Sequence, residues 1–140
     1  MNMERNQGIQ FLSREEIRAY QEKRMAEALD YVSKNSPFYS KLFSDNHIDI
    51  SKIRTLDDLS CIPVTTKPDL QSRNQNFVCV PPSEIVDYPT TSGTLGDPVT
   101  FAETESDLEH LAYNEFLSFS TAGCTRDDII QLMVTIDRRF

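Results

Sequence analysis

One nine-residue stretch has the residue types and spacing of a loop that binds an anion. Thr90-Thr91-Ser92-Gly93-Thr94-Leu95-Gly96-Asp97-Pro98 starts with three hydroxyl residues and contains two glycines three positions apart. Glycine adopts left-handed backbone angles without strain, so such a loop can surround a phosphate with backbone N–H groups while hydroxyls donate to the remaining oxygens. An ordinary glycine-containing hairpin turn has the same composition. A Walker A loop is excluded, because Asp97-Pro98 follows the second glycine, where that loop requires Lys-Ser/Thr.

The remaining residues with chemical potential do not form groups by their spacing. The three cysteines, an odd number, lack the spacing of a metal site or a disulfide framework; they are Cys61, Cys79 and Cys124. His47 and His110 are isolated, and we interpret them as ordinary surface or half-buried residues. Acids at positions 103–109 lie near an expected helix start, where acids are favoured, and we interpret them as a solvated face. We predict no metal site and no catalytic residue.

The net charge of −8 comes from one part of the chain. Residues 74–125 contain eight acids and no Lys or Arg, whereas residues 1–73 and 126–140 each hold as many bases as acids. Such a surface repels phosphate backbones, so nucleic-acid binding is not expected. A single nucleotide can bind there only if backbone N–H groups or a metal ion supply the positive field.

Composition and apolar patterning indicate a packed protein of the reducing cytoplasm. Hydrophobic residues make up 39% of the 140 residues, which is enough for a core. No apolar run approaches the roughly 20 residues that span a bilayer, and the first residues lack a basic start followed by an apolar segment. We therefore expect neither membrane insertion nor secretion.

A long helix is expected at the start of the chain. Ser13 and Glu16 form a capping box, and Leu12 and Ile17 form the matching hydrophobic staple. Apolar residues then recur at helical spacing until Ser36-Pro37 ends the helix.

Further helix starts lie downstream. Short helices are expected over 38–43 and after Thr55 and Thr66, because a capping residue precedes each one. A longer helix is expected from Thr104 to a stop at Gly123. The residues expected on its inward face are Leu108, Leu111, Ala112, Phe116 and Phe119.

Extended segments are expected on both sides of the nine-residue loop and near the end of the chain. Residues 77–80 read as a short extended run, and residues 84–91 and 98–101 as two paired strands. Residues 129–136 are nearly continuously apolar, as in a strand that is buried on both faces of a parallel sheet. Such a strand needs neighbours on both edges, so it either pairs with another molecule or belongs to a longer protein. We favour the longer protein.

Four segments resemble the phenylacetate–CoA ligase family of the adenylate-forming superfamily. Residues 88–99 resemble its phosphate loop, usually Thr-Ser-Gly-Thr-Thr-Gly-Lys-Pro, and residues 35–42 its Asn-Ser-Pro-Phe-Tyr stretch. Residues 55–59 resemble its Leu-Asp-Asp-Leu segment, and residues 62–70 its Leu-Pro-Thr-Thr-Lys-x-Asp-Leu segment. The order and spacing of all four agree.

The resemblance implies an α/β fold and an activity. Residues 1–73 would form a helical N-terminal subdomain, and residues 74–140 the incomplete start of an AMP-binding domain with a β-hairpin phosphate loop and the first strand of a mostly parallel sheet. Family members join a carboxylic acid, typically an aryl acid, to coenzyme A through an acyl-adenylate, consuming ATP and Mg²⁺; they are commonly dimers. By position, the nucleotide-binding residues would be Thr91, Ser92, Gly93, Thr94 and Gly96.

Two loop positions depart from the family pattern. Asp97 replaces the loop lysine, and Leu95 replaces the second threonine. The adenine pocket, ribose-binding acid, Glu metal ligand and adenylation lysine of the family have no counterpart in these residues, so we expect the 140 residues alone to be inactive. A non-catalytic interaction module built on the same scaffold, and an adenylating enzyme with another acceptor, are the alternatives.

Overall fold

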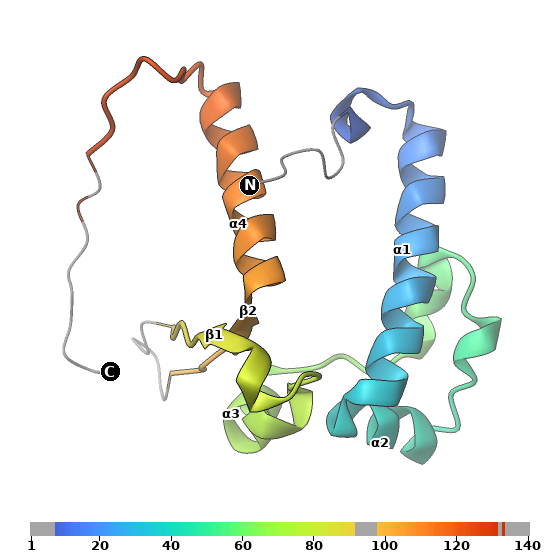
Figure 1. Ribbon diagram of the computed structural model, residues 1–140. Helices are drawn as coiled ribbons and strands as arrows, with labels where there is room; N and C mark the ends of the chain where they lie inside the picture. The colour runs from blue at the N-terminus through green and yellow to red at the C-terminus, as the bar shows by residue number, and fades with distance from the viewer. Residues whose placement is uncertain (1–7, 92–97, 132, 134–140) are drawn as a thin grey trace.

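The computed structural model describes residues 8–91, 98–131 and 133 and is rich in helix (Figure 1). Its longer elements are the helices α1 (Arg14–Asn35), α2 (Pro37–Asp45), α3 (Lys67–Arg73) and α4 (Glu105–Thr121) and the strands β1 (Ile85–Asp87) and β2 (Glu103–Thr104). The short 3₁₀ helices are η1 (Ile9–Phe11), η2 (Ile50–Lys52), η3 (Leu56–Cys61), η4 (Asn74–Phe77) and η5 (Pro82–Glu84). None of the helices in the described ranges combines the length and apolar character needed to cross a bilayer.

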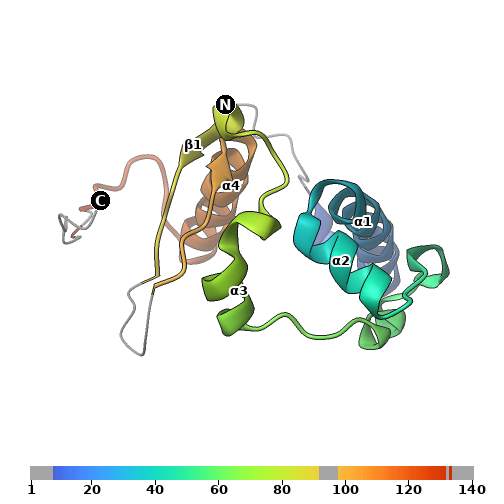
Figure 2. The ribbon, with the colours of Figure 1, turned by 90° about the horizontal axis from the view of Figure 1, so that it is seen from below.

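The elements form two groups joined by α3 and η4. Figure 2 shows α1 and α2 packed together on one side and α4 with β1 on the other, with α3 between them. The core of the first group is a cluster of Leu29, Phe43 and Ile53, each at most 9% exposed. Partly buried Met25 and Val32 of α1 pack against it, so the apolar face predicted for this helix does turn inward.

The local helix signals are confirmed. Ser13 donates its N–H to the Glu16 carboxylate at 2.8 Å, and Glu16 returns its N–H to the Ser13 hydroxyl at 3.2 Å, which completes the expected capping box. The same reciprocal bonds open α4 at Thr104. Gly123, with φ of +90°, stands just past that helix as a left-handed stop.

Two further capping boxes, at Thr55 and Thr66, make the free energy of unfolding depend on pH. Hydrogen bonds from the backbone of Thr55 lower the pKa of Asp58, and hydrogen bonds from Thr66, led by its hydroxyl, lower the pKa of Asp69. A carboxylate with a lowered folded pKa contributes its full stability above its unfolded pKa and loses it as the pH falls through the folded value.

We therefore expect the urea midpoint of the chain to fall as the pH drops below about 4, the unfolded pKa of an aspartate. An Asp58→Asn/Asp69→Asn variant is expected to be less stable at neutral pH and to show a shallower fall, since two of the titrating groups are gone. Urea unfolding followed by far-UV circular dichroism at several pH values measures this. Parallel pH profiles for the variant and the wild type would contradict the assignment.

The strand pair is shorter and less regular than predicted. β1 pairs antiparallel with β2, with Ile85 opposite Thr104, Asp87 opposite Glu103 and an irregularity between the two positions. Closer to the loop only an isolated bridge joins Thr90 to Thr100. The expected strand over 84–91 is thus too long, and the one over 98–101 is misplaced, because the strand lies at Glu103–Thr104. Pro89 accepts the N–H of Phe101 but has no N–H to donate in return, which interrupts the ladder.

Two other predicted extended segments are absent from the described residues. Phe77 ends the 3₁₀ helix η4, and residues 78–80 have no regular structure. Residues 129–131 and 133, from the predicted buried strand, also lack regular structure, and Ile129 is fully exposed. No described segment pairs with them, and a strand forms only where a neighbour accepts and donates its backbone hydrogen bonds. The rest of that predicted strand lies outside the described residues.

The inward face predicted for α4 is correct only in part. Leu108 and Ala112 are half-buried. Leu111, Phe116 and Phe119 are 44–46% exposed, and Tyr113, which was not predicted to be buried, is 8% exposed. The second half of α4, which carries Phe116 and Phe119, extends beyond the short sheet (Figure 1).

Candidate functional site

The root of the nine-residue loop is held together by backbone pairing. The loop root comprises residues 89–91 and 98–101. Thr91 donates its N–H to the Val99 carbonyl at 3.0 Å, and Phe101 donates its N–H to the Pro89 carbonyl at 2.9 Å. Val99, only 2% exposed, anchors this ladder in the interior. These hydrogen bonds therefore fix the distance between the two arms of the loop root.

Thr91 has a role at the root that sequence reasoning did not assign to it. Its hydroxyl accepts the N–H of Val99 at 3.0 Å. A hydroxyl that accepts one hydrogen bond still has its own hydrogen to donate, and Thr91 is exposed. The Thr91 hydroxyl can therefore donate to a phosphate while it keeps its contact with Val99. Ser92, Gly93, Thr94 and Gly96, the other predicted binding residues, lie outside the described residues, as do Leu95 and Asp97.

A long-range contact joins the loop root to η4. The side-chain amide of Asn74 donates to the carbonyl of Thr100 at 2.7 Å. A cavity of about 300 Å³ lies beside this contact, lined in part by Leu70, Asn74, Tyr88 and Val99. Sequence reasoning missed Asn74, because nothing in the local pattern of an asparagine after a helix indicates a partner 26 residues away.

Two of the segments that carry the family resemblance, residues 35–42 and 62–70, contact each other, and the first of them also contacts η4. The hydroxyl of Tyr39, in residues 35–42, lies 3.4 Å from the hydroxyl of Thr65, in residues 62–70. Ser36, also in residues 35–42, donates its hydroxyl to the carbonyl of Asn76 at 2.9 Å. Asn76 belongs to η4, the 3₁₀ helix that contacts the loop root. The helical residues upstream thus form part of the support of the loop.

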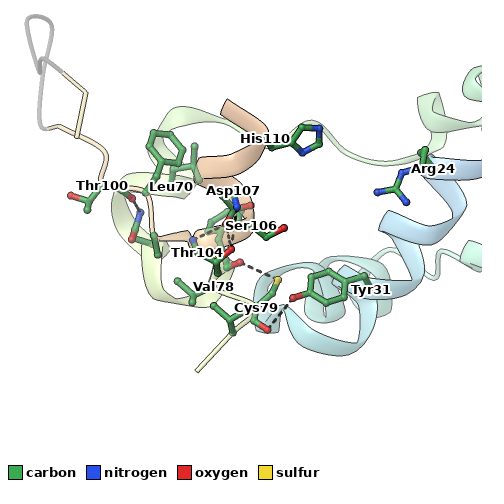
Figure 3. Close-up of a pocket in the computed structure, with 15 residues that line it drawn as sticks. Arg24, Tyr31, Leu70, Val78, Cys79, Thr100, Thr104, Ser106, Asp107 and His110 are labelled. Atoms are coloured by element: carbon green, nitrogen blue, oxygen red, sulfur yellow. Dashed lines mark hydrogen bonds between the residues drawn. The ribbon is translucent and has the colours of Figure 1, made fainter. Parts of the chain in front are cut away.

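A larger cavity of about 610 Å³ lies between α1 and α4 (Figure 3). Arg24 projects from α1 and His110 from α4, on two sides of the cavity, and Cys79 and Tyr31 lie at its base. Arg24 pairs with Glu27 on its own helix, so its charge is already partly compensated. Tyr31 donates its hydroxyl to the Cys79 carbonyl at 3.4 Å. Within the described ranges, no three His, Cys, Asp or Glu side chains come together as a metal-binding group.

The environment of Cys79 makes a weak nucleophile. Burial raises the pKa of its thiol, outweighing an opposite effect of Ser36, and the thiol lies 3.4 Å from the Phe77 carbonyl. Burial likewise raises the pKa of Tyr31, and electrostatic interactions with Cys79, Glu84 and Asp107 add to the effect. Both groups therefore stay protonated and neutral at physiological pH, and the cavity holds no activated nucleophile among them.

We expect iodoacetamide to modify Cys79 more slowly than the exposed Cys61 in the native chain. Because burial raises the pKa of the Cys79 thiol, its thiolate fraction, and with it the rate, is expected to be still increasing steeply at about pH 8.5, the usual thiol pKa. Peptide mass spectrometry after timed alkylation measures both rates, and the same reaction in urea provides the control in which they converge. Equal native rates would contradict the assigned environment of Cys79.

Comparison with known proteins identifies the relatives of the chain. No family model matches it. The phenylacetate-coenzyme A ligase of Thermus thermophilus is 34% identical over 116 residues, covering 82% of this chain and 26% of the relative. The Escherichia coli enzyme of the same name is 31% identical over 126 residues, covering 89% of this chain and 29% of the relative. The chain thus spans about a quarter of the length of the curated relatives it matches.

Solved structures of one ligase show the same fold. A 2-hydroxyisobutyryl-CoA ligase in complex with 2-HIB-AMP and CoA, in its thioesterification state, matches 74% of this chain at a TM-score of 0.67 and 27% identity. An open conformation of that ligase matches at a TM-score of 0.66 and 25% identity. The match covers 23% and 25% of the two solved chains. By sequence and by fold, the chain is similar to the N-terminal part of phenylacetate–coenzyme A ligases and of a related CoA ligase of the adenylate-forming superfamily.

Proposed function

We propose that the chain is the N-terminal part of an ATP-dependent acid–CoA ligase and supplies its phosphate loop. In the complete reaction a substrate carboxylate oxygen attacks the α-phosphorus of MgATP and pyrophosphate leaves. The sulfur of CoA then attacks the acyl carbon, and AMP leaves. The observation that carries the proposal is the paired loop root, which presents a hydroxyl-and-glycine loop in a chain related to such ligases.

The chain contributes binding and orientation in this proposal. Residues 74–125 contain no Lys or Arg, so the backbone N–H groups of the loop and the Mg²⁺ that accompanies ATP supply the positive field. Residues 91–94 and 96 would contact the β- and γ-phosphates. We assign residues 1–73 to a helical subdomain and residues 74–140 to the start of the AMP-binding domain. We place the enzyme in the cytoplasm, with a carboxylic acid and CoA as its other substrates.

The 140 residues alone are proposed not to form an acyl-adenylate, because they include no candidate for the lysine that assists adenylation in the family. An ATP–pyrophosphate exchange assay with Mg²⁺ and phenylacetate tests this, with a complete relative such as the Thermus thermophilus enzyme as the positive control. Exchange by the chain above background would show that the catalytic groups have been placed incorrectly.

A non-catalytic interaction module is the second candidate. Asp97, at the position of the family's lysine, and the absence of cations from residues 74–125 favour it. Exposed Phe116 and Phe119 on α4 would then belong to a surface for self-association or for another part of a ligase. Reading the gene beyond codon 140 separates the candidates: an in-frame continuation with the adenylation lysine supports the ligase, and a stop codon supports the module. A continuation with the same motifs but another acceptor domain would indicate an adenylating enzyme that does not use CoA.

A further inference from the structure

The 3₁₀ helix η4 is attached at both ends to elements far away in sequence. Asn74, its first residue, donates its side-chain amide to the Thr100 carbonyl at 2.7 Å. Asn76 accepts the Ser36 hydroxyl at its carbonyl at 2.9 Å. One short element therefore bonds to the loop root and to the junction of α1 and α2.

The attachment to the helices is rigid. Ser36 is 1% exposed, and its hydroxyl also accepts the N–H of Tyr39 at 3.3 Å. The ring of Phe77, the last residue of η4, stacks on buried Phe38 with centroids 3.9 Å apart and an interplanar angle of 24°. The same ring meets Tyr39 edge-on, with centroids 5.8 Å apart. Displacing η4 would break a partly buried hydrogen bond and an aromatic cluster together.

At the loop root, the amide of Asn74 bonds to a backbone carbonyl that the pairing of the two arms leaves unused. Thr90 and Thr100 face each other in an antiparallel bridge, while the hydrogen bonds around them are made by the flanking residues Thr91, Val99 and Phe101. In such a pair the carbonyl of the bridged residue points away from the partner strand. The Thr100 carbonyl therefore faces η4, where the amide of Asn74 meets it.

We propose that Asn74 is a positioning residue for the phosphate loop. Its amide fixes the arm of the loop root that carries Thr100 to η4, and through η4 to α1 and α2. The part of this inference that concerns nucleotide binding rests on the proposed function. The part that concerns the loop root rests on the contacts described above. Without the amide, the ladder is held by its two backbone rungs and by the bond from the Val99 N–H to the Thr91 hydroxyl, so the root opens more often and must be closed again when the ligand binds. Ordering at that moment costs affinity.

The test uses three variants of the 140-residue chain and one control. Asn74→Asp keeps the shape of the side chain but replaces the amide donor with a carboxylate, and Asn74→Ala removes both. Asn74→Gln keeps the donor on a longer side chain. The control is Asn35→Ala, because the Asn35 amide also donates to a carbonyl at 2.8 Å, but to Tyr31 within α1.

Two readouts are needed. Amide hydrogen exchange by NMR reports opening at Thr91 and Phe101 without any ligand, and calorimetry gives the dissociation constant for MgATP. For Asn74→Ala we expect both amides to exchange about two- to twelvefold faster, the equilibrium constant equivalent of one net hydrogen bond, and the dissociation constant to rise by a similar factor. Asn74→Asp is expected to show at least as large an effect, Asn74→Gln to recover most of it, and Asn35→Ala to change neither quantity.

The outcomes separate this inference from the proposed function. Wild-type exchange rates at Thr91 and Phe101 in Asn74→Asp would overturn the positioning role, whatever nucleotide does. Faster exchange with an unchanged dissociation constant would overturn the link to binding, as would a Gln variant as impaired as Ala. Failure of the wild-type chain to bind MgATP would reject the proposed function, and the exchange rates would still decide whether Asn74 holds the root.

Discussion

Replacing Asp97 with lysine is expected to lower the dissociation constant for MgATP by about 10- to 150-fold. One charge-assisted hydrogen bond to phosphate contributes about 1.5–3 kcal/mol, which corresponds to that range. The substitution restores the residue of the family pattern and removes a carboxylate from the loop that is proposed to bind the phosphates. The effect is large because residues 74–125 provide no other cation. Calorimetric titration of Asp97→Lys and wild type with MgATP measures it.

The matched control for Asp97→Lys is Glu115→Lys, which changes the net charge equally at an exposed position on α4. Glu115 is not among the proposed phosphate contacts, and salt screens the longer-range effect of an exposed charge, so this variant is expected to bind MgATP nearly as the wild type does at physiological salt. Equal tightening in both variants would show a general effect of net charge. An unchanged constant in Asp97→Lys would mean that position 97 does not face the phosphates.

Phe43→Ala is expected to destabilise the helical group by about 3–5 kcal/mol, the range for deleting a buried phenylalanine side chain. Phe43 is 6% exposed and belongs to the small cluster with Leu29 and Ile53. Its ring also lies 6.0 Å from that of Tyr39, so the loss extends to the aromatic contacts near η4. Because native stabilities are themselves only about 5–15 kcal/mol, the variant is expected to be largely unfolded in moderate urea.

Urea unfolding followed by circular dichroism measures the stability of Phe43→Ala. Phe11→Ala is the matched control, because Phe11 is 84% exposed and its truncation is expected to change the free energy of unfolding by less than about 0.5 kcal/mol. A loss in Phe43→Ala no larger than in Phe11→Ala would show that the cluster around Leu29 does not form the core.

The helix starts could be predicted from the sequence because their determinants are local. A Ser or Thr followed three residues later by an acid specifies its own partner, as Ser13 and Glu16 do, and Thr104 and Asp107 likewise. The left-handed stop at Gly123 is equally local. In these places the chain carries the capping residue and its partner within a single turn.

The support of the candidate site could not be predicted, because it depends on residues far apart in sequence. The amide of Asn74 and the carbonyl of Thr100 meet only after α3, η4 and both arms of the loop are in place. The extended strands failed for a related reason. Apolar runs such as 129–136 indicate a strand only when neighbours are present to pair with it, and the described residues offer none. The loop and a pair of extended segments beside it were predicted, but the hydrogen bonds that pair the root and hold it were not.

The central claim is that a hydroxyl-and-glycine loop without a nearby cation binds nucleotide phosphates through its own backbone amides. Titration of the ¹⁵N-labelled chain with MgATP, followed by the amide resonances of residues 91–96, tests it most directly. We expect these resonances to shift saturably with MgATP and far less with AMP, which lacks the β- and γ-phosphates. Resonances that stay in place with MgATP, or that move equally with AMP, would contradict the account.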